Sequence, residues 1–130
     1  MLGAPKLYTV PTELFTAVGL RPGGAVGRSF RCEHADVAFV PIAQIRGPTI
    51  APGKRGLDRD RLSSIISGIA GGVALPPVPV CWEAEGSKAV LLDGAHRFAV
   101  SIAYGFCEIP SLILSIEEAR DGYNYPEGQR

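Results

Sequence analysis

The chain has 130 residues, enough for one domain with its own hydrophobic core and too few for two. Hydrophobic residues make up 46% of it and charged residues 20%, proportions that exclude a disordered chain. Basic and acidic residues are equal at 13 each, so the net charge of zero gives no support for DNA as a partner. No apolar stretch is long enough to span a membrane and no secretory signal pattern is present, so we expect no membrane association.

The three cysteines are widely spaced, odd in number and form no CxxC pair. With only two histidines in the chain, this pattern predicts neither a zinc site nor a disulfide framework, and it favours a reduced, cytoplasmic location. Cys81 and Cys107 lie in apolar strand or turn sequence, so both are predicted to be buried and inert.

The first 36 residues are broken into short pieces by prolines and by the Gly23-Gly24 pair. They predict a short strand over residues 7–10, one or two helical turns over residues 12–18 and a strand over residues 28–32. We interpret residues 1–36 as an N-terminal elaboration packed on the main domain, residues 37–114. It could cover a site or mediate a homodimer.

The main domain begins with an apolar, β-prone stretch over residues 37–42, in which Pro41 predicts an edge position or a strand end. Residues 47–56 predict a loop, after which Asp58 has the character of a helix N-cap. An apolar stripe with i, i+3, i+4, i+7 spacing follows on one face of that helix, and Gly71-Gly72 ends it. The stripe consists of Leu62, Ile65, Ile66 and Ile69.

A hairpin is predicted next, with strands over residues 78–82 and 89–92 joined by a turn over residues 83–88. An Asp-Gly turn then leads into a helix that ends at Gly105. A last strand is predicted over residues 109–114. Residues 115–130 form a C-terminal tail that begins with a helical turn over residues 116–120 and ends polar.

The segment from Asp93 to Arg97 carries the clearest chemical signal in the chain. A strand, a tight glycine turn and a helix start point several backbone N–H groups at one spot, where the positive end of the helix dipole adds to them. Arg97 supplies a planar charge suited to phosphate oxygens, and His96 a donor whose charge can change near neutral pH. The segment therefore predicts an anion site. The plain alternative is a turn before an ordinary helix, with both side chains solvated.

The order of these elements resembles the superfamily shared by the N-terminal domain of ParB partition proteins and by sulfiredoxin. The resemblance covers about residues 37–114. It rests on the helix containing Leu-Ser-Ser-Ile-Ile at 62–66, the Leu-Pro-Pro-Val-Pro-Val at 75–80, the Leu-Asp-Gly-Ala-His-Arg-Phe-Ala at 92–99 and the Tyr-Gly-Phe-Cys-Glu-Ile-Pro at 104–110. It implies an α+β fold, with a small mixed β-sheet and flanking helices.

The resemblance also implies where a nucleotide would bind. His96 and Arg97 would contact phosphate, with Gly94 and Ala95 offering backbone N–H groups. Arg61 and Ser64, three residues apart on the preceding helix, match a basic residue and a hydroxyl that sulfiredoxins use. The alternative for that pair is an exposed helix face.

Two departures from the relatives bear on activity. Sulfiredoxins carry their catalytic cysteine where this chain has Ala95, so reduction of a sulfinic acid is disfavoured. ParB proteins continue into DNA-binding and dimerisation regions and typically have Arg-Arg where this chain has His96-Arg97, which disfavours partition function by this chain alone.

The same Asp-Gly-X-His-Arg form resembles small kinases that phosphorylate free serine. It implies a nucleotide (ATP, CTP or ADP) with Mg²⁺ as cofactor, and phosphoryl transfer or nucleotide hydrolysis with Asp93 and His96 as candidate catalytic residues. Asp93 could equally cap the helix or fix the turn. A non-catalytic nucleotide-sensing or DNA-associated module and a nuclease are the competing interpretations, but the nuclease lacks an evident second acidic cluster.

Overall fold

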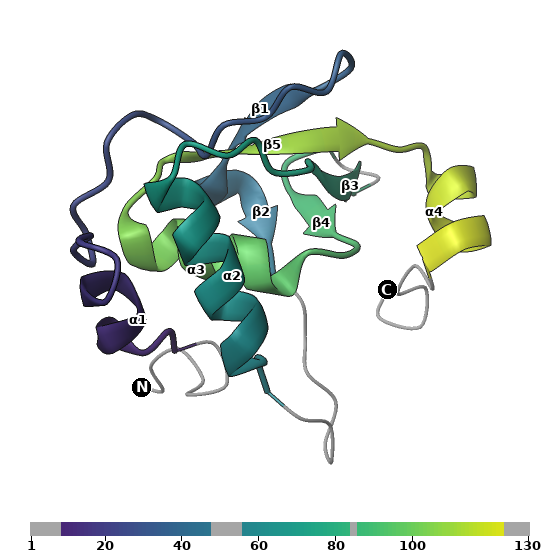
Figure 1. Ribbon diagram of the computed structural model, residues 1–130. Coiled ribbons are helices and arrows are strands. Elements are labelled where there is room, and N and C mark those ends of the chain that lie inside the picture. The colour runs from purple at the N-terminus through teal and green to yellow at the C-terminus, as the bar shows by residue number, and fades with distance from the viewer. Residues whose placement is uncertain (1–8, 48–55, 84–85, 124–130) are drawn as a thin grey trace.

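The computed structural model describes residues 9–47, 56–83 and 86–123. A five-stranded mixed sheet in the order β1-β5-β3-β4-β2 forms the centre of the molecule (Figure 1). The strands are β1 (Ala38–Pro41), β2 (Ile45–Arg46), β3 (Val78–Trp82), β4 (Ala89–Leu91) and β5 (Glu108–Ile113). The helices are α1 (Thr12–Thr16), the 3₁₀ turn η2 (Ile42–Gln44), α2 (Arg59–Ala70), α3 (Ala95–Tyr104) and α4 (Ile116–Tyr123).

Strands β3 and β4 form the predicted antiparallel hairpin, with Val80 opposite Leu91. The last strand, β5, returns parallel to β3, and β1 lies antiparallel to β5 at the edge of the sheet. The edge position predicted from Pro41 is therefore confirmed. The strand β2 was not predicted, because two residues carry no readable alternation. It pairs in parallel with β4 at the opposite edge.

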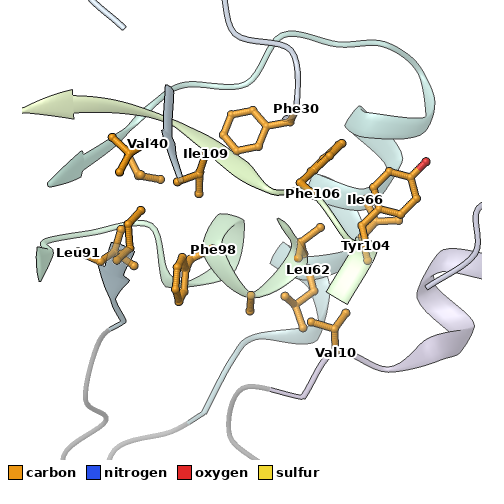
Figure 2. Packing of buried hydrophobic residues seen from close by; sticks show 14 of the residues in the cluster. Val10, Phe30, Val40, Leu62, Ile66, Leu91, Phe98, Tyr104, Phe106 and Ile109 are labelled. Atoms are coloured by element: carbon orange, nitrogen blue, oxygen red, sulfur yellow. The ribbon is translucent and has the colours of Figure 1, made fainter. Parts of the chain in front are cut away.

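The main core lies between one face of the sheet and the helices α2 and α3, which pack against each other, with α2 crossing in front of α3 in Figure 1. Figure 2 shows Leu62 and Ile66 of α2 in the same cluster of buried side chains as Phe98 and Tyr104 of α3. Leu62 and Ile66 are the buried members of the predicted apolar stripe, and Ile65 and Ile69 are half-buried. The stripe therefore does what its spacing predicts: it places α2 on the core.

Part of the N-terminal segment belongs to the same core. Val10, Leu14, Phe15 and Phe30 are buried in the cluster, and the Phe15 ring stacks on Tyr104 with 5.8 Å between ring centroids. The helix predicted over residues 12–18 is confirmed as the shorter α1. The predicted strand over residues 7–10 lies partly outside the described residues, and its last two residues are irregular.

The strand predicted over residues 28–32 is wrong. The segment is irregular, and its carbonyl groups accept isolated hydrogen bonds instead of a ladder. Arg28 O accepts from Cys107 N and Glu108 N, and Arg31 O accepts from Leu75 N. Residues 28–32 are β-prone, but they lie across the start of β5 and next to the segment that follows α2 without forming a strand.

The C-terminal helix α4 extends beyond the turn predicted over residues 116–120 to Tyr123, and a capping box starts it. Ser115 Oγ accepts from Glu118 N at 3.1 Å, while Glu118 Oε1 accepts from Ser115 N at 2.8 Å. Ala119 of α4 is buried. Cys81 and Val90, which pair on the face of the sheet opposite the main core, are buried as well. None of the described helices is both long enough and apolar enough to cross a bilayer.

Candidate functional site: the turn before α3 and the start of α2

The turn between β4 and α3 can be made only by glycine. Gly94 has a φ of +95° and is the N-cap of α3. A Cβ atom at this position would lie 2.5 Å from Val78 Cγ1 and 3.2 Å from the Arg97 Nη2 atom. Both the left-handed backbone and the close approach of β3 therefore exclude a side chain. Asp93 steadies the turn, since its Oδ1 accepts a hydrogen bond from Gly94 N at 2.8 Å.

The N-terminus of α3 carries no side-chain cap. The first backbone hydrogen bond of the helix runs from Phe98 N to Gly94 O. The N–H groups of residues 95–97 therefore have no acceptor within the helix. These three donors, together with the helix dipole, give the start of α3 a positive potential. By contrast, Asp58 caps α2 by accepting a hydrogen bond from Arg61 N at 2.9 Å.

A hollow of about 420 Å³ opens beside this uncapped end. It is formed by the start of α3 and by one exposed face of α2. The structure thus brings together every residue that the sequence proposes for the site, and adds Ile65, which the sequence assigned only to the core. The lining residues are Arg61, Ser64, Ile65, Asp93, Gly94, Ala95, His96 and Arg97.

Arg97 is held in place by backbone carbonyl groups. Its Nη1 donates to Pro76 O at 2.7 Å and to Pro77 O at 3.1 Å, just before β3 begins. Burial lowers the pKa of the guanidinium, an effect opposed mainly by the charge of Asp93, but the group remains a cation. Because one nitrogen is anchored, the remaining N–H groups have a fixed direction. The carbonyl groups of Pro76 and Pro77 are thus the anchor.

The Nε2 atom of His96 accepts a hydrogen bond, although the sequence predicts that this side chain acts as a donor. Nε2 accepts a hydrogen bond from the backbone N–H of Asp58 at 2.8 Å. Burial, and then the nearby positive charge of Arg61, lower the pKa of the imidazole, against the opposing effect of Asp58 and Asp93. A neutral ring with its proton on Nδ1 is the form that fits this contact. His96 is therefore an acceptor at Nε2, where a donor was expected.

Arg61 and Ser64 are exposed on α2 and face the hollow. Their neighbours Leu62 and Ile66 are buried on the other side of the helix, so core packing fixes which face α2 presents. The Asp58 cap was readable from the sequence and is confirmed. Its backbone bond to His96 was not, because the partner of a single N–H group depends on tertiary structure.

The cysteines lie outside this hollow. Cys81 is buried, as predicted, and its burial raises the pKa of the thiol. The prediction for Cys107 is wrong, since the residue is exposed at the turn before β5. Within the described ranges, no cluster of three His, Cys, Asp or Glu side chains could hold a metal ion.

No protein-family model matches the sequence, and no curated protein does. Solved structures do match. Sulfiredoxin from Arabidopsis thaliana aligns with a TM-score of 0.52 and 22% identity over 65% of this chain and 93% of its own. A variant of free serine kinase in complex with ADP aligns with a TM-score of 0.51 and 21% identity over 65% of this chain and 34% of its own.

The chromosome-partitioning protein ParB from Caulobacter crescentus, C-terminally truncated and complexed with CTP-γ-S, matches with a TM-score of 0.49 and 18% identity. That match covers 62% of this chain and 44% of ParB. The α+β, ParB/sulfiredoxin-like fold expected from the sequence is thus confirmed. The alignment spans nearly all of sulfiredoxin but only about a third of the kinase.

Proposed function

We propose that this protein binds a nucleotide through its phosphate groups, in the hollow between α2 and the start of α3. The observation that carries the proposal is the convergence of two guanidinium groups, Arg61 and Arg97, on an uncapped helix N-terminus. Such a combination of fixed cations and N–H donors suits phosphate oxygens. A structure of a free serine kinase variant, which shares the fold, is a complex with the nucleotide ADP.

Each lining residue has a role in this proposal. The N–H groups of Ala95, His96 and Arg97 and the free edge of the Arg97 guanidinium would bind one phosphate group, whereas the Gly94 N–H, which the sequence suggests as a further donor, is already bound to Asp93 Oδ1. Arg61 and the Ser64 hydroxyl, on the facing helix, would bind the next phosphate or the sugar. Ile65 gives this wall of the hollow an apolar patch on which part of the nucleoside can rest.

A magnesium ion fits this site only as a companion of the nucleotide. Asp93 is the single carboxylate among the lining residues, and Mg²⁺ in nucleotide sites is commonly held by one or two carboxylates together with phosphate oxygens. Asp93 is exposed, and its Oδ1 is already bound to Gly94 N, which leaves Oδ2 to face a cation. Asp93 would hold such an ion together with the nucleotide, and the ion would supply positive charge next to the phosphate groups.

Phosphoryl transfer or nucleotide hydrolysis is the catalytic form of the proposal. It is favoured by the presence of Asp93 in the same hollow as the two arginines, because a carboxylate can orient an acceptor hydroxyl or a water molecule. The alternative is a non-catalytic nucleotide sensor with the same binding residues. Incubation with ATP, CTP or GTP and Mg²⁺, followed by detection of released phosphate and of the nucleoside diphosphate, separates the two. Turnover supports the catalytic form, and binding without turnover supports the sensor.

Binding is tested by calorimetry with ADP, ATP and CTP, with and without Mg²⁺. Arg61→Ala should weaken binding at least tenfold, because a charge-assisted contact contributes about 1.5–3 kcal/mol. The matched control is Arg59→Ala, two residues earlier on the same helix. Arg59 is exposed, pairs with Glu13 and does not line the hollow. Equal affinity of the two variants, or no binding of any of these nucleotides, would contradict the proposal.

A further inference from the structure

We propose that His96 is a positioning residue: through Nε2 it holds the backbone of Asp58, and thereby fixes the first turn of α2, with Arg61, opposite the start of α3. The inference rests on the proposed function, since it assigns His96 a part in assembling the phosphate site. It differs from the expectation that His96 acts only by touching phosphate.

The contact joins the residue that precedes α2 to the start of α3. Asp58 N and His96 Nε2 are 2.8 Å apart, and the two residues are separated by 38 positions in the sequence. The N–H group of an N-cap residue lies outside the hydrogen-bonding pattern of its helix, so it needs a partner from elsewhere. His96 supplies that partner from the second residue of α3.

The effect of this bond reaches Arg61 through the cap itself. Asp58 Oδ2 accepts from Arg61 N, so His96, Asp58 and Arg61 form a continuous series of two hydrogen bonds. Leu62 and Ile66 anchor the middle of α2 in the core. The first turn, which carries Arg61, has the His96 bond as its tether to α3. Loss of this bond would leave the Asp58 cap in place but would release the first turn from α3, and terminal turns are the parts of a helix that move most readily.

The chemistry of the ring separates the two roles that a histidine could have here. With Nε2 accepting, the proton resides on Nδ1, and Nδ1 is the only ring nitrogen left to donate to a phosphate oxygen. Protonation of Nε2 would set two donors against each other and break the contact with Asp58. In the part of the chain that the structure describes, the charged groups that act on the ring are Arg61 of α2, its N-cap Asp58, and Asp93 from the turn before α3.

Two amide substitutions distinguish the nitrogens. A glutamine side chain reaches about as far as Nε2 and can accept from Asp58 N, whereas asparagine reaches only as far as Nδ1 and can replace a donor to phosphate. We expect His96→Gln to bind ADP about fivefold more tightly than His96→Asn, the effect of one hydrogen bond. The same order is expected for the melting temperatures without ligand.

The unsubstituted protein provides a measurement that needs no nucleotide. Long-range ¹H–¹⁵N NMR at pH 7.5 should show an unprotonated Nε2 on His96, and His96→Gln should keep the Asp58 amide resonance closer to its original position than His96→Asn does. The control is His34→Gln. His34 also accepts a backbone N–H, from Asp36 through Nδ1, but lies outside the hollow, so its substitution should leave both readouts unchanged.

The outcomes are decisive in either direction. Stronger binding and a higher melting temperature for glutamine than for asparagine uphold the positioning role. Equal variants, the reverse order, or a proton on Nε2 overturn it and leave direct phosphate contact as the role of His96. If the unsubstituted protein binds no nucleotide, the proposed function fails, while the ring tautomer and the two melting temperatures still decide the tether.

Discussion

Replacement of Gly94 by alanine should unfold the turn on which the site is built. The left-handed conformation, with a φ of +95°, costs a residue with a Cβ about 1–2 kcal/mol. The added methyl group would lie 2.5 Å from Val78 Cγ1, and overpacking of this kind costs roughly 1–3 kcal/mol. Alanine also restricts the unfolded chain, which offsets less than about 1 kcal/mol. The net loss is about 2–4 kcal/mol, a large part of a typical domain stability of about 5–15 kcal/mol.

Urea unfolding and differential scanning calorimetry measure this loss, which corresponds to a fall in melting temperature of about 8–16 °C for a domain of this size. The matched control is Gly72→Ala. Gly72 has a φ of +70°, but a Cβ there would meet nothing within 4 Å. It therefore carries the backbone penalty without the collision, and its variant should lose only about 1 kcal/mol.

A second comparison isolates the collision with β3. Val78→Ala removes the Cγ1 atom that the new methyl group would strike, so the double variant Val78→Ala/Gly94→Ala should be more stable than the two single losses predict, by about 1–3 kcal/mol. A Gly94→Ala variant as stable as Gly72→Ala, or losses of the two single variants that simply add in the double variant, would show that the collision with Val78 does not occur.

Three further predictions concern the helix starts and the imidazole. Asp58→Ala should cost about 1 kcal/mol in urea unfolding by removing the cap of α2, whereas Asp58→Asn, which can still accept from Arg61 N, should lose less. Because burial lowers the pKa of His96, the unfolded chain takes up that proton first, so melting temperature should fall as pH drops through about 6.5; His96→Gln should remove this part of the pH dependence. Ser115→Ala should speed amide exchange in α4, and an unchanged exchange rate there would contradict the capping box.

The elements that the sequence predicted well are those with strong local signals. Asp58 and Gly71-Gly72 mark the two ends of α2, and Gly105, with a φ of +101°, ends α3 as expected. The hairpin was readable because apolar runs flank a polar turn. The failures have the opposite cause: residues 28–32 have β propensity but make only isolated hydrogen bonds with the start of β5 and with Leu75, and β2 exists only because β4 lies beside it.

In the site, too, local sequence predicts what lies close together along the chain and misses what depends on tertiary contacts. Residues that lie close together in sequence, from Asp93 to Arg97, could be assigned to one place from the turn and the helix start. Arg61 and Ser64 were added by resemblance, and the structure places them across the same hollow. What the sequence could not provide was the use of each polar atom. That Arg97 Nη1 binds two carbonyl groups and that His96 Nε2 accepts from a backbone N–H depends on which segments fold against α3.

The two borders of the sheet bear on how this protein behaves at high concentration. One border is the four-residue β1, which finishes with a proline that has no N–H to offer, and the other is the two-residue β2. A foreign chain that added itself to either border would find too few unpaired backbone groups to form a lasting ladder. The short edge strands thus disfavour the addition of strands from other copies to this largely apolar sheet. Any association between copies would then use side-chain surfaces.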